Sequence, residues 1–483
     1  MLFNSHGFIF LFLPIVLCGY FFFIQRRLPR YALSFLLASS LFFYAYWDYR
    51  FLVLLIGSIG FNFGMGYLIS KWDDWKKKGV FFLAIGLDLA LLFHFKYFTF
   101  IKEVFASLTG QTHTFEGMIL PLGISFFTFT QIAYLIDLYQ GKAKSSDFIS
   151  YALFVTVFPH LIAGPILHHK DMMTQFDDMG NKGWSIENIS KGIFLFIVGL
   201  TKKVLIADYL STLVSPVFDG PLESLPFFHA WCAALIYTLQ LYFDFSGYSD
   251  MAVGLGLLFN LHLPINFDSP YKATSMIDFW RRWHISLSIF LRDYLYIPLG
   301  GNRNGDWAKM QNLFVTMLLG GIWHGAGWTF VLWGACHGFL LIINHTWRSF
   351  RIHLPNSFSR IITFAAIMIT WVIFRSPNIT VMIHILKGMF GMNGVALPTS
   401  FGPYLSWLSS FGVEFIHLEH LLFKGKEMIL LVIMTIVVLF LPNSNYWKER
   451  FFHYRFSGAL CACIFVFVLL NLTEVSEFLY YQF

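Results

Sequence analysis

The sequence predicts an all-α, polytopic membrane protein, and three observations support this fold class. Of the 483 residues, 57% are hydrophobic and only 12% are charged, whereas soluble domains carry about 25% charged residues. The apolar residues gather in runs that approach the length of about 20 residues needed by a membrane-spanning helix. Short clusters of Lys and Arg separate these runs, as in the cytoplasmic loops of membrane proteins.

Candidate helices are expected wherever such an apolar run occurs. The runs cover residues 7–24, 32–46, 51–69, 79–98, 116–138, 148–166, 188–200, 227–243, 248–261, 312–343, 359–375, 427–442 and 456–472. Run 188–200 is expected to stop at Thr201-Lys202-Lys203, and run 312–343 has room for two elements with a break near Gly325-Ala326-Gly327. Short and interrupted helices are tolerated at membrane depth only where they pack on protein or line a cavity. The sequence therefore predicts a hollow helical body.

The basic clusters also predict an orientation. Run 7–24 is followed, not preceded, by the basic residues Arg26 to Arg30, so it is expected to be a retained helix rather than a cleaved signal peptide. Lys71 to Lys78 and Lys448 to Arg455 are basic as well, and positive loops favour the cytoplasmic side. Both the N-terminus and the C-terminus are then expected to be extracytoplasmic.

Neither nucleic-acid binding nor a metal site is predicted. The net charge of +6 is spread over short interhelical clusters, which act as topology signals and not as a nucleic-acid face. The five cysteines lie in apolar runs without paired CxxC motifs. His337 and His345 follow His324 at spacings that do not form an i, i+4 ligand pair. Both are expected to be polar-edge residues.

The stretch from Asp278 to Tyr296 is expected to form an amphipathic helix. Its apolar residues at 279, 283, 287, 290, 291 and 294 follow helical spacing, with charge on the opposite face. Such a helix can floor a polar cavity, in which case His284 faces that cavity. It can equally lie on the membrane surface, where Arg281 and Arg282 would bind anionic lipid head groups.

His324 is the strongest candidate for a catalytic residue. It lies in an otherwise uncharged run of more than 20 residues, between glycines and tryptophans. An ionisable group at membrane depth is costly, which favours a functional role over a structural hydrogen bond. Acyl transfer to a hydroxyl needs a base for the alcohol proton and donors for the developing oxyanion. His324 suits the first task, and His284 or the indole N–H of Trp323 suits the second.

A further motif, Phe-Asp-Phe-Ser-Gly-Tyr-Ser-Asp at 243–250, places two carboxylates between two apolar runs. Asp244 and Asp250 are expected to pair with Arg281, Arg282 or Lys202 across the cavity, because an unpaired buried carboxylate would be neutralised instead.

Four motifs together resemble the membrane-bound O-acyltransferase family. They are the 243–250 motif, Asp-Phe-Trp-Arg-Arg-Trp-His-Ile-Ser-Leu-Ser at 278–288, Arg-Asp-Tyr-Leu-Tyr-Ile-Pro-Leu-Gly-Gly-Asn at 292–302, and Gly-Gly-Ile-Trp-His-Gly-Ala at 320–326. The branch that they resemble holds membrane components of alginate and peptidoglycan O-acetylation and of teichoic acid D-alanylation. The resemblance spans nearly the whole chain.

The resemblance implies a ring of about 11–13 transmembrane and re-entrant helices around a central tunnel, with in-plane amphipathic helices, in the bacterial inner membrane. It implies one domain, 1–483, with N-terminal helices in 1–115, a catalytic core in 116–350 and C-terminal helices and tail in 351–483. His324 matches the family's catalytic histidine and His284 its second characteristic histidine. Six further residues are expected to line or support the tunnel: Trp280, Trp323, Arg281, Arg282, Asp244 and Asp250.

The resemblance also implies the donor and the partner. Acetyl groups would come from a cytoplasmic thioester, acetyl-CoA, and no cofactor would be bound permanently. They would pass to an extracytoplasmic partner of the SGNH hydrolase-like type for O-acetylation of an exopolysaccharide or peptidoglycan. The C-terminal Phe-Leu-Tyr-Tyr-Gln-Phe at 478–483 is similar to a terminal motif of this branch, which implies Tyr480 as acyl carrier. The alternative for this motif is an aromatic anchor at the membrane interface.

Two other functions compete with acyl transfer. A transporter of a lipid-linked or polysaccharide substrate would also contain broken helices and intramembrane charges, but it predicts two related halves, and each histidine motif occurs once. A scaffold that docks an extracytoplasmic enzyme gives no reason for a histidine at membrane depth.

Overall fold

The computed structural model describes residues 1–110, 118–178, 183–221, 225–352, 354–416, 425–451, 456–472 and 479. Within this part, four helical segments are long and apolar enough to cross a membrane: Gly7–Gln25, Arg50–Lys71, Asp74–Thr109 and Asn356–Arg375. A bent pair, Gly425–Phe440 with Ser444–Arg450, would provide a fifth crossing. The predicted all-α, multi-pass membrane class is confirmed, although many helices are shorter than a full crossing.

The N-terminal part is a succession of helices, two of which contain a π-helical turn. Its elements are η1 (Gly7–Phe12), α1 (Leu13–Gln25), α2 (Pro29–Ala45), α3 (Arg50–Lys71), α4 (Asp74–Leu92), η2 (Phe93–Tyr97), α5 (Phe98–Thr109), α6 (Ile124–Tyr139), α7 (Phe148–Thr156) and α8 (His169–Asp177). The π-helical η2 joins α4 and α5 into one segment.

The middle of the chain contains the longest helix and all the histidine motifs. Its elements are α9 (Ile186–Thr201), η4 (Lys202–Ala207), α10 (Asp208–Asp219), α11 (Phe227–Leu258), η5 (Pro270–Lys272), α12 (Met276–Trp280), α13 (Ile285–Leu291), η6 (Arg292–Tyr296), α14 (Gly305–His324) and α15 (Trp328–Ser349).

The C-terminal part combines helices with the two strands found in the described residues. Its elements are α16 (Asn356–Arg375), α17 (Ile379–Met389), β1 (Val395–Pro398), η7 (Thr399–Phe401), α18 (Gly402–Leu405), η8 (Ser406–Phe411), β2 (Val413–Ile416), α19 (Gly425–Phe440), α20 (Ser444–Arg450) and α21 (Ser457–Leu470). The strands pair in parallel, Val395 opposite Val413.

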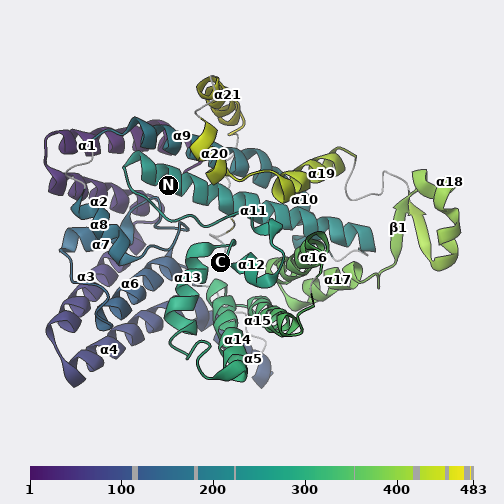
Figure 1. Ribbon diagram of the computed structural model, residues 1–483, viewed down its shortest axis with the longest axis horizontal. Helices are drawn as coiled ribbons and strands as arrows, with labels where there is room; N and C mark the ends of the chain where they lie inside the picture. The colour runs from purple at the N-terminus through teal and green to yellow at the C-terminus, as the bar shows by residue number, and fades with distance from the viewer. Residues whose placement is uncertain are drawn as a thin grey trace.

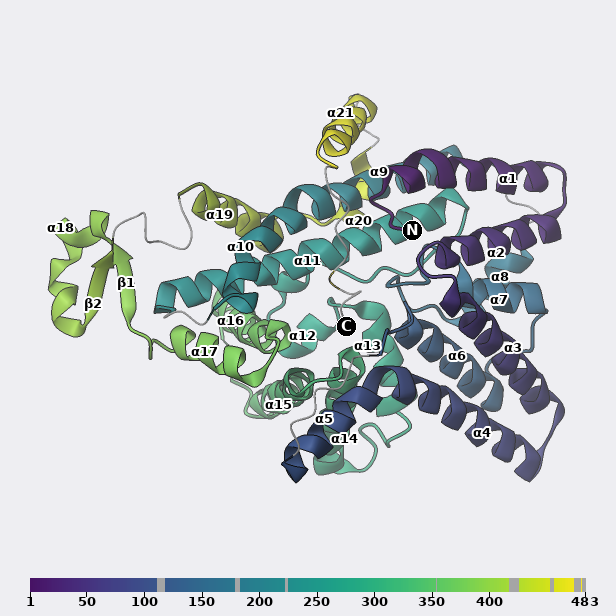
Figure 2. The ribbon, with the colours of Figure 1, turned by 180° about the vertical axis from the view of Figure 1, so that it is seen from behind.

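The short helices α12 and α13 lie in the middle of the molecule (Figure 1). The N-terminal helices α2, α3, α4, α6, α7 and α8 flank them on one side and α14 to α17 on the other, where α5 lies beside α14, while α9 and α11 run along a third side (Figure 2). Buried side chains form two hydrophobic clusters, one mainly N-terminal and one around α11, α12 and α14 to α17. The histidine motifs are therefore surrounded by helices from both ends of the chain.

Small residues let α9 and α11 pack with their backbones almost in contact. A Cβ atom added at Gly199 would lie 2.5 Å from the carbonyl oxygen of Gly247, and one added at Gly192 would lie 2.7 Å from that of Gly254. Close backbone approach of this kind is a common way for membrane helices to associate. Gly247 belongs to the 243–250 motif, so the motif also serves helix packing.

Two sequence expectations about these helices are wrong. Runs 227–243 and 248–261 form the single helix α11, so Asp244 and Asp250 lie within a helix and not between two elements. Lys202 and Lys203 do not end α9, because the chain continues through the π-helical η4 into α10. The charge of the two lysines suggested the end of a helix. Each of them instead forms a buried ion pair, which is described below.

Candidate active site

His324 is the last residue of α14, at the tip of a tight helical hairpin. The break predicted at Gly325-Ala326-Gly327 is confirmed, since α14 ends at His324 and α15 starts at Trp328. The two helices cross closely: a Cβ atom added at Gly321 would lie 2.5 Å from the carbonyl oxygen of Phe330. Glycine is therefore required one turn before His324, and the hairpin fixes where the imidazole is held.

Aromatic rings enclose the imidazole of His324, which is only 6% exposed. The ring centroids of Trp323 and Trp333 each lie 5.0 Å from that of His324, and Phe374 lies 5.4 Å away. Phe374 comes from α16, so a third helix closes the pocket around the hairpin tip. Such a water-poor enclosure strengthens any charge interaction that forms inside it.

His284 lies in a break between two short helices, not on one long helix. The expected continuous helix over 278–296 is wrong, because α12 ends at Trp280 and α13 begins at Ile285. His284 takes a left-handed backbone conformation, with φ at 43°, which is uncommon for a residue other than glycine. Its buried ring meets Phe245 edge-on at 4.8 Å, and it interacts electrostatically with His324.

His337 is part of the same site, which sequence reasoning missed. It was expected to be a polar-edge residue, but its side chain is 0% exposed. The indole N–H of Trp280 donates to its Nδ1 over 3.2 Å, and its ring lies 4.5 Å from that of Trp333. An acceptor Nδ1 in a neutral imidazole leaves the proton on Nε2. Its position on α15, 13 residues after His324, concealed this role because the hairpin turn intervenes.

Three buried N–H groups near His324 have no hydrogen-bond partner in the described part of the chain. They are Nε1 of Trp323, Nε1 of Trp333 and Nε2 of His337. A buried donor left without an acceptor costs about 1–3 kcal/mol. Donors that are retained at this cost around a candidate base are suited to a substrate oxygen.

The two aspartates of α11 form ion pairs with the consecutive lysines of η4. Lys202 Nζ lies 2.6 Å from Asp250, and Lys203 Nζ lies 2.8 Å from both Asp244 and Asp208. Lys202 was an expected partner of this pair of carboxylates, and Lys203 was not. The pairs join η4 to α11 and satisfy charges that would otherwise be buried alone.

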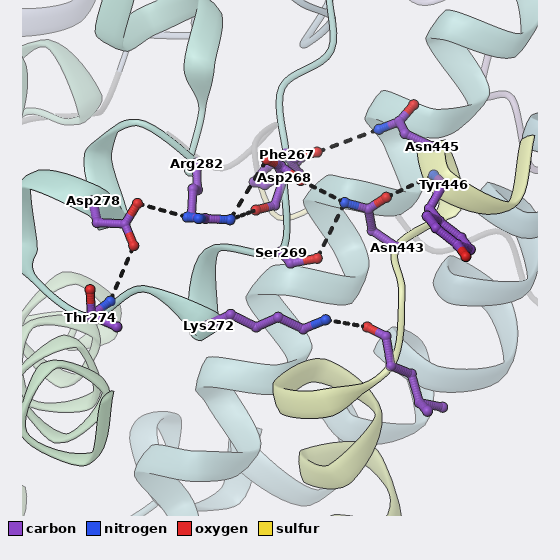
Figure 3. Close-up of polar contacts among 11 residues, drawn as sticks. Phe267, Asp268, Ser269, Lys272, Thr274, Asp278, Arg282, Asn443, Asn445 and Tyr446 are labelled. Atoms are coloured by element: carbon purple, nitrogen blue, oxygen red, sulfur yellow. Dashed lines mark hydrogen bonds and ion pairs between the residues drawn. The ribbon is translucent and has the colours of Figure 1, made fainter. Parts of the chain in front are cut away.

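Arg282 pairs elsewhere, as Figure 3 shows. Its guanidinium donates to Asp278 at 2.8 Å and lies 3.7 Å from Asp268. Asn443, at the start of α20, donates to Asp268 as well. Of the three expected partners for the aspartates of the 243–250 motif, Lys202 is therefore observed, and among the described residues neither Arg281 nor Arg282 forms an ion pair with them.

Arg281 is exposed and lines a cavity of about 740 Å³ between α12, α15 and α16. Asp278, Asn344 and Arg348 supply further polar groups to its wall, and Leu340 and Ile362 are among the apolar residues. The cavity thus offers two guanidinium groups beside an apolar surface.

Leu479 is the last residue that the structure describes. Leu479 packs against the hydrophobic cluster that contains Trp333, and its backbone N–H donates to Asp244 over 3.0 Å. The expected carrier Tyr480 follows directly but lies outside the described residues. Within the described residues, no group of three His, Cys, Asp or Glu side chains could hold a metal ion.

Comparison with known proteins identifies the family. The model of the membrane-bound O-acyltransferase family matches residues 88–384, which include both histidine motifs and the hairpin tip. The chain belongs to the membrane-bound O-acyltransferase family. It is a multi-pass membrane enzyme that transfers acyl groups, as the resemblance implied.

Full-length and partial relatives carry related names. The chain is 41% identical to a peptidoglycan O-acetyltransferase of Helicobacter pylori, over 100% of this chain and 98% of that protein. It is 42% identical to a probable alginate O-acetylase, AlgI, of Pseudomonas aeruginosa over 81% of this chain and 75% of the other. It is 27% identical to a teichoic acid D-alanyltransferase of Streptococcus thermophilus over 48% of this chain and 58% of that protein.

Proposed function

We propose that this enzyme moves acetyl groups from cytoplasmic acetyl-CoA toward a cell-envelope polysaccharide outside the membrane, with His324 as the catalytic base. The observation that carries the proposal is the enclosure of His324 at the tip of the α14–α15 hairpin, among buried N–H donors. Family membership favours acyl transfer over the transporter alternative.

The step that His324 would promote is the attack of a hydroxyl on the thioester. Its imidazole takes the hydroxyl proton while the oxygen bonds to the carbonyl carbon. The carbon–sulfur bond then breaks, and coenzyme A leaves as a thiolate that takes up a proton. The N–H groups of Trp333 and His337 are placed to donate to the carbonyl oxygen, where negative charge develops.

The cavity of about 740 Å³ supports a phosphate-bearing donor. Arg281 and Arg348 line it, and guanidinium groups bind phosphates in a bidentate manner. Arg348 lies in the last turn of α15 and Arg351 just after it, and the positive-inside tendency predicts a cytoplasmic position for this end of the helix. An acetyl-CoA molecule would keep its phosphates here while its thioester reaches toward the hairpin tip.

Tyr480 is the proposed acceptor of the acetyl group. The backbone N–H of the preceding residue, Leu479, is held by Asp244, which supports a tail that enters the ring of helices. The tyrosyl oxygen would form an ester and then pass the acetyl group to an extracytoplasmic SGNH hydrolase-like partner. That partner would acetylate the polymer, which is peptidoglycan or an alginate-type exopolysaccharide on the strength of the named relatives.

The first experiment follows radiolabelled acetyl groups from acetyl-CoA with purified enzyme in liposomes. We expect His324→Ala to lower transfer at least about a hundredfold, the usual scale for the loss of a general base. The matched control is His345→Ala, because His345 lies on the same hairpin near the other end of α15. Normal transfer by a correctly inserted His324→Ala enzyme would refute the proposed base.

A second experiment tests the carrier. Tyr480→Phe removes only the hydroxyl that would bear the acetyl ester, so we expect label to be absent from the C-terminal peptide and delivery to the partner to stop. Tyr481→Phe is the matched control, because it changes the neighbouring tyrosine of the same motif. Full delivery by Tyr480→Phe would exclude Tyr480 as the carrier, whichever role His324 plays.

A further inference from the structure

A lysine far from the histidine motifs contacts the backbone of the hairpin tip. Lys96 lies in η2, within the segment Asp74–Thr109, and is 8% exposed. Its Nζ lies 2.6 Å from the carbonyl oxygen of Trp323, 3.0 Å from that of His324 and 3.2 Å from the hydroxyl of Ser125. An ammonium group has three N–H donors, and each of them has an acceptor here.

The acceptors are backbone groups that α14 cannot satisfy itself. The last four carbonyl groups of any α-helix have no intrahelical partner, and Gly325 leaves the helix in an extended conformation. The hydroxyl of Tyr97 donates to the carbonyl oxygen of Ile322 over 2.9 Å. Two consecutive residues of η2 thus satisfy the carbonyls of residues 322, 323 and 324.

We propose that Lys96 is a positioning residue of the active site. It fixes the C-terminal end of α14 and thereby holds the imidazole of the base His324 in the orientation needed for catalysis. The inference rests on the proposed role of His324. A cation at a helix C-terminus is favoured by the helix dipole, and at membrane depth no water replaces it. Lys96 is not an acyl acceptor, because its three N–H groups are committed to the hairpin and to Ser125.

The physical consequence of losing Lys96 is a loosened hairpin tip. Without the cation, the carbonyls of Trp323 and His324 would be left without donors, and the last turn of α14 would rearrange toward other partners. A displacement of about 1 Å at a catalytic group can cost about a hundredfold in rate. Lys96 does not line the cavity that contains Arg281 and Arg348, so we expect donor binding there to be unaffected.

The test measures kcat and KM for acetyl-CoA with the full-length enzyme in liposomes. Lys96→Met keeps the length of the side chain and removes its donors, whereas Lys96→Arg keeps charge and donors. Tyr97→Phe removes one hydrogen bond to the same helix end. Lys102→Met is the matched control, because Lys102 lies at the exposed surface of α5, less than two turns along the same segment.

We expect Lys96→Met to lower kcat by about ten- to a hundredfold with KM within about twofold of the wild-type value. Lys96→Arg is expected to recover most of the loss, Tyr97→Phe to lose a few-fold, and Lys102→Met to match the wild type. In the His324→Ala background, Lys96→Met should cause no further loss, because residues that act as one unit are not additive.

Three outcomes would overturn the inference. The first is a wild-type kcat for Lys96→Met. The second is an additive loss in the His324→Ala background. The third is a rise in KM together with a lower melting temperature that Lys96→Arg does not repair, which would indicate a structural role alone. If Lys96→Met protein does not insert, an unchanged kcat for Tyr97→Phe counts against the inference. An active His324→Ala enzyme would instead refute the proposed function itself.

Discussion

The two consecutive lysines of η4 pair with carboxylates from neighbouring helices. Lys203 of η4 bridges Asp244 of α11 and Asp208 of α10, and Lys202 reaches Asp250. Such buried ion pairs contribute little net stability, because the cost of removing both charges from water offsets their mutual attraction. Their value here is that they hold Asp244 where it accepts a hydrogen bond from the backbone N–H of Leu479.

Removal of one partner should therefore be more harmful than removal of both. We expect Lys203→Met to destabilise the protein by about 3–5 kcal/mol, because it leaves Asp244 buried and uncompensated. Thermal unfolding in detergent measures the effect. The double variant Lys203→Met/Asp244→Asn should recover part of the lost melting temperature, and a double variant less stable than Lys203→Met would contradict the explanation.

At the scale of elements, the α14–α15 hairpin links helix packing to chemistry. Its close crossing at Gly321 and Gly334 leaves no room for a side chain, and His324 follows Gly321 within one turn. A change in the packing of these two helices therefore moves the base directly.

Gly321→Ala should for this reason lower both stability and rate. The added Cβ would lie 2.5 Å from a backbone oxygen, and overpacking of this kind costs about 1–3 kcal/mol. Melting temperature and kcat should both fall. The matched control is Gly60→Ala in α3, where a Cβ meets nothing within 4 Å and alanine suits a helix better. Equal behaviour of the two variants would show that the crossing does not position His324.

The sequence correctly predicted those helices and breaks that depend only on neighbouring residues in the chain. The break after His324 was predictable because two glycines in an apolar run mark an interruption, and run 7–24 was predictable from its composition. The π-helical η4 was not, because the two lysines that look like a helix stop are accommodated by pairs with α10 and α11. Likewise, the pattern at 278–296 has helical spacing, but the turn at His284 is accompanied by long-range backbone hydrogen bonds, from the N–H of Ile285 to Asn266 and from the N–H of Asp268 to Arg282, which the local pattern does not reveal.

The residues of the candidate site likewise fall into those that the sequence could predict and those that it could not. His324, His284 and Trp323 were predictable from motifs, since their residue types are unusual in an apolar run. Lys96 and His337 were not, because their roles depend on contacts across 227 residues and on a hairpin turn, respectively. The signal for Lys96 in the sequence is its charge within the apolar run 79–98, since a charged residue at membrane depth needs a partner.

At the scale of the whole molecule, the basic loops predict which face meets the cytoplasm. Helix α3 has 22 residues and at 1.5 Å per residue is about 33 Å long, enough to cross the hydrocarbon core. Its two ends should then lie on opposite sides. The exposed residues Tyr49 and Lys78 mark these sides.

Cysteine labelling tests this orientation in intact cells. In a cysteine-free background, we expect a membrane-impermeant maleimide to label Tyr49→Cys from outside and to label Lys78→Cys only after permeabilisation. The positive-inside tendency is the reason. The reverse pattern would invert the predicted topology and with it the direction of acetyl transfer.

The π-helical turn η2 affects the helical register of the residues around it. A π-helix closes its hydrogen bonds one residue later than an α-helix, so the turn absorbs one extra residue, and the residues after it keep the faces that they would have in a regular helix one residue shorter. Lys96 and Tyr97 face α14 in this register. Deletion of a single residue between Phe93 and Lys96 would restore a regular α-helix and leave both side chains close to the face that meets α14. A one-residue gap at this point would thus be a smaller change than a gap in a regular helix, which rotates all later residues by about 100°.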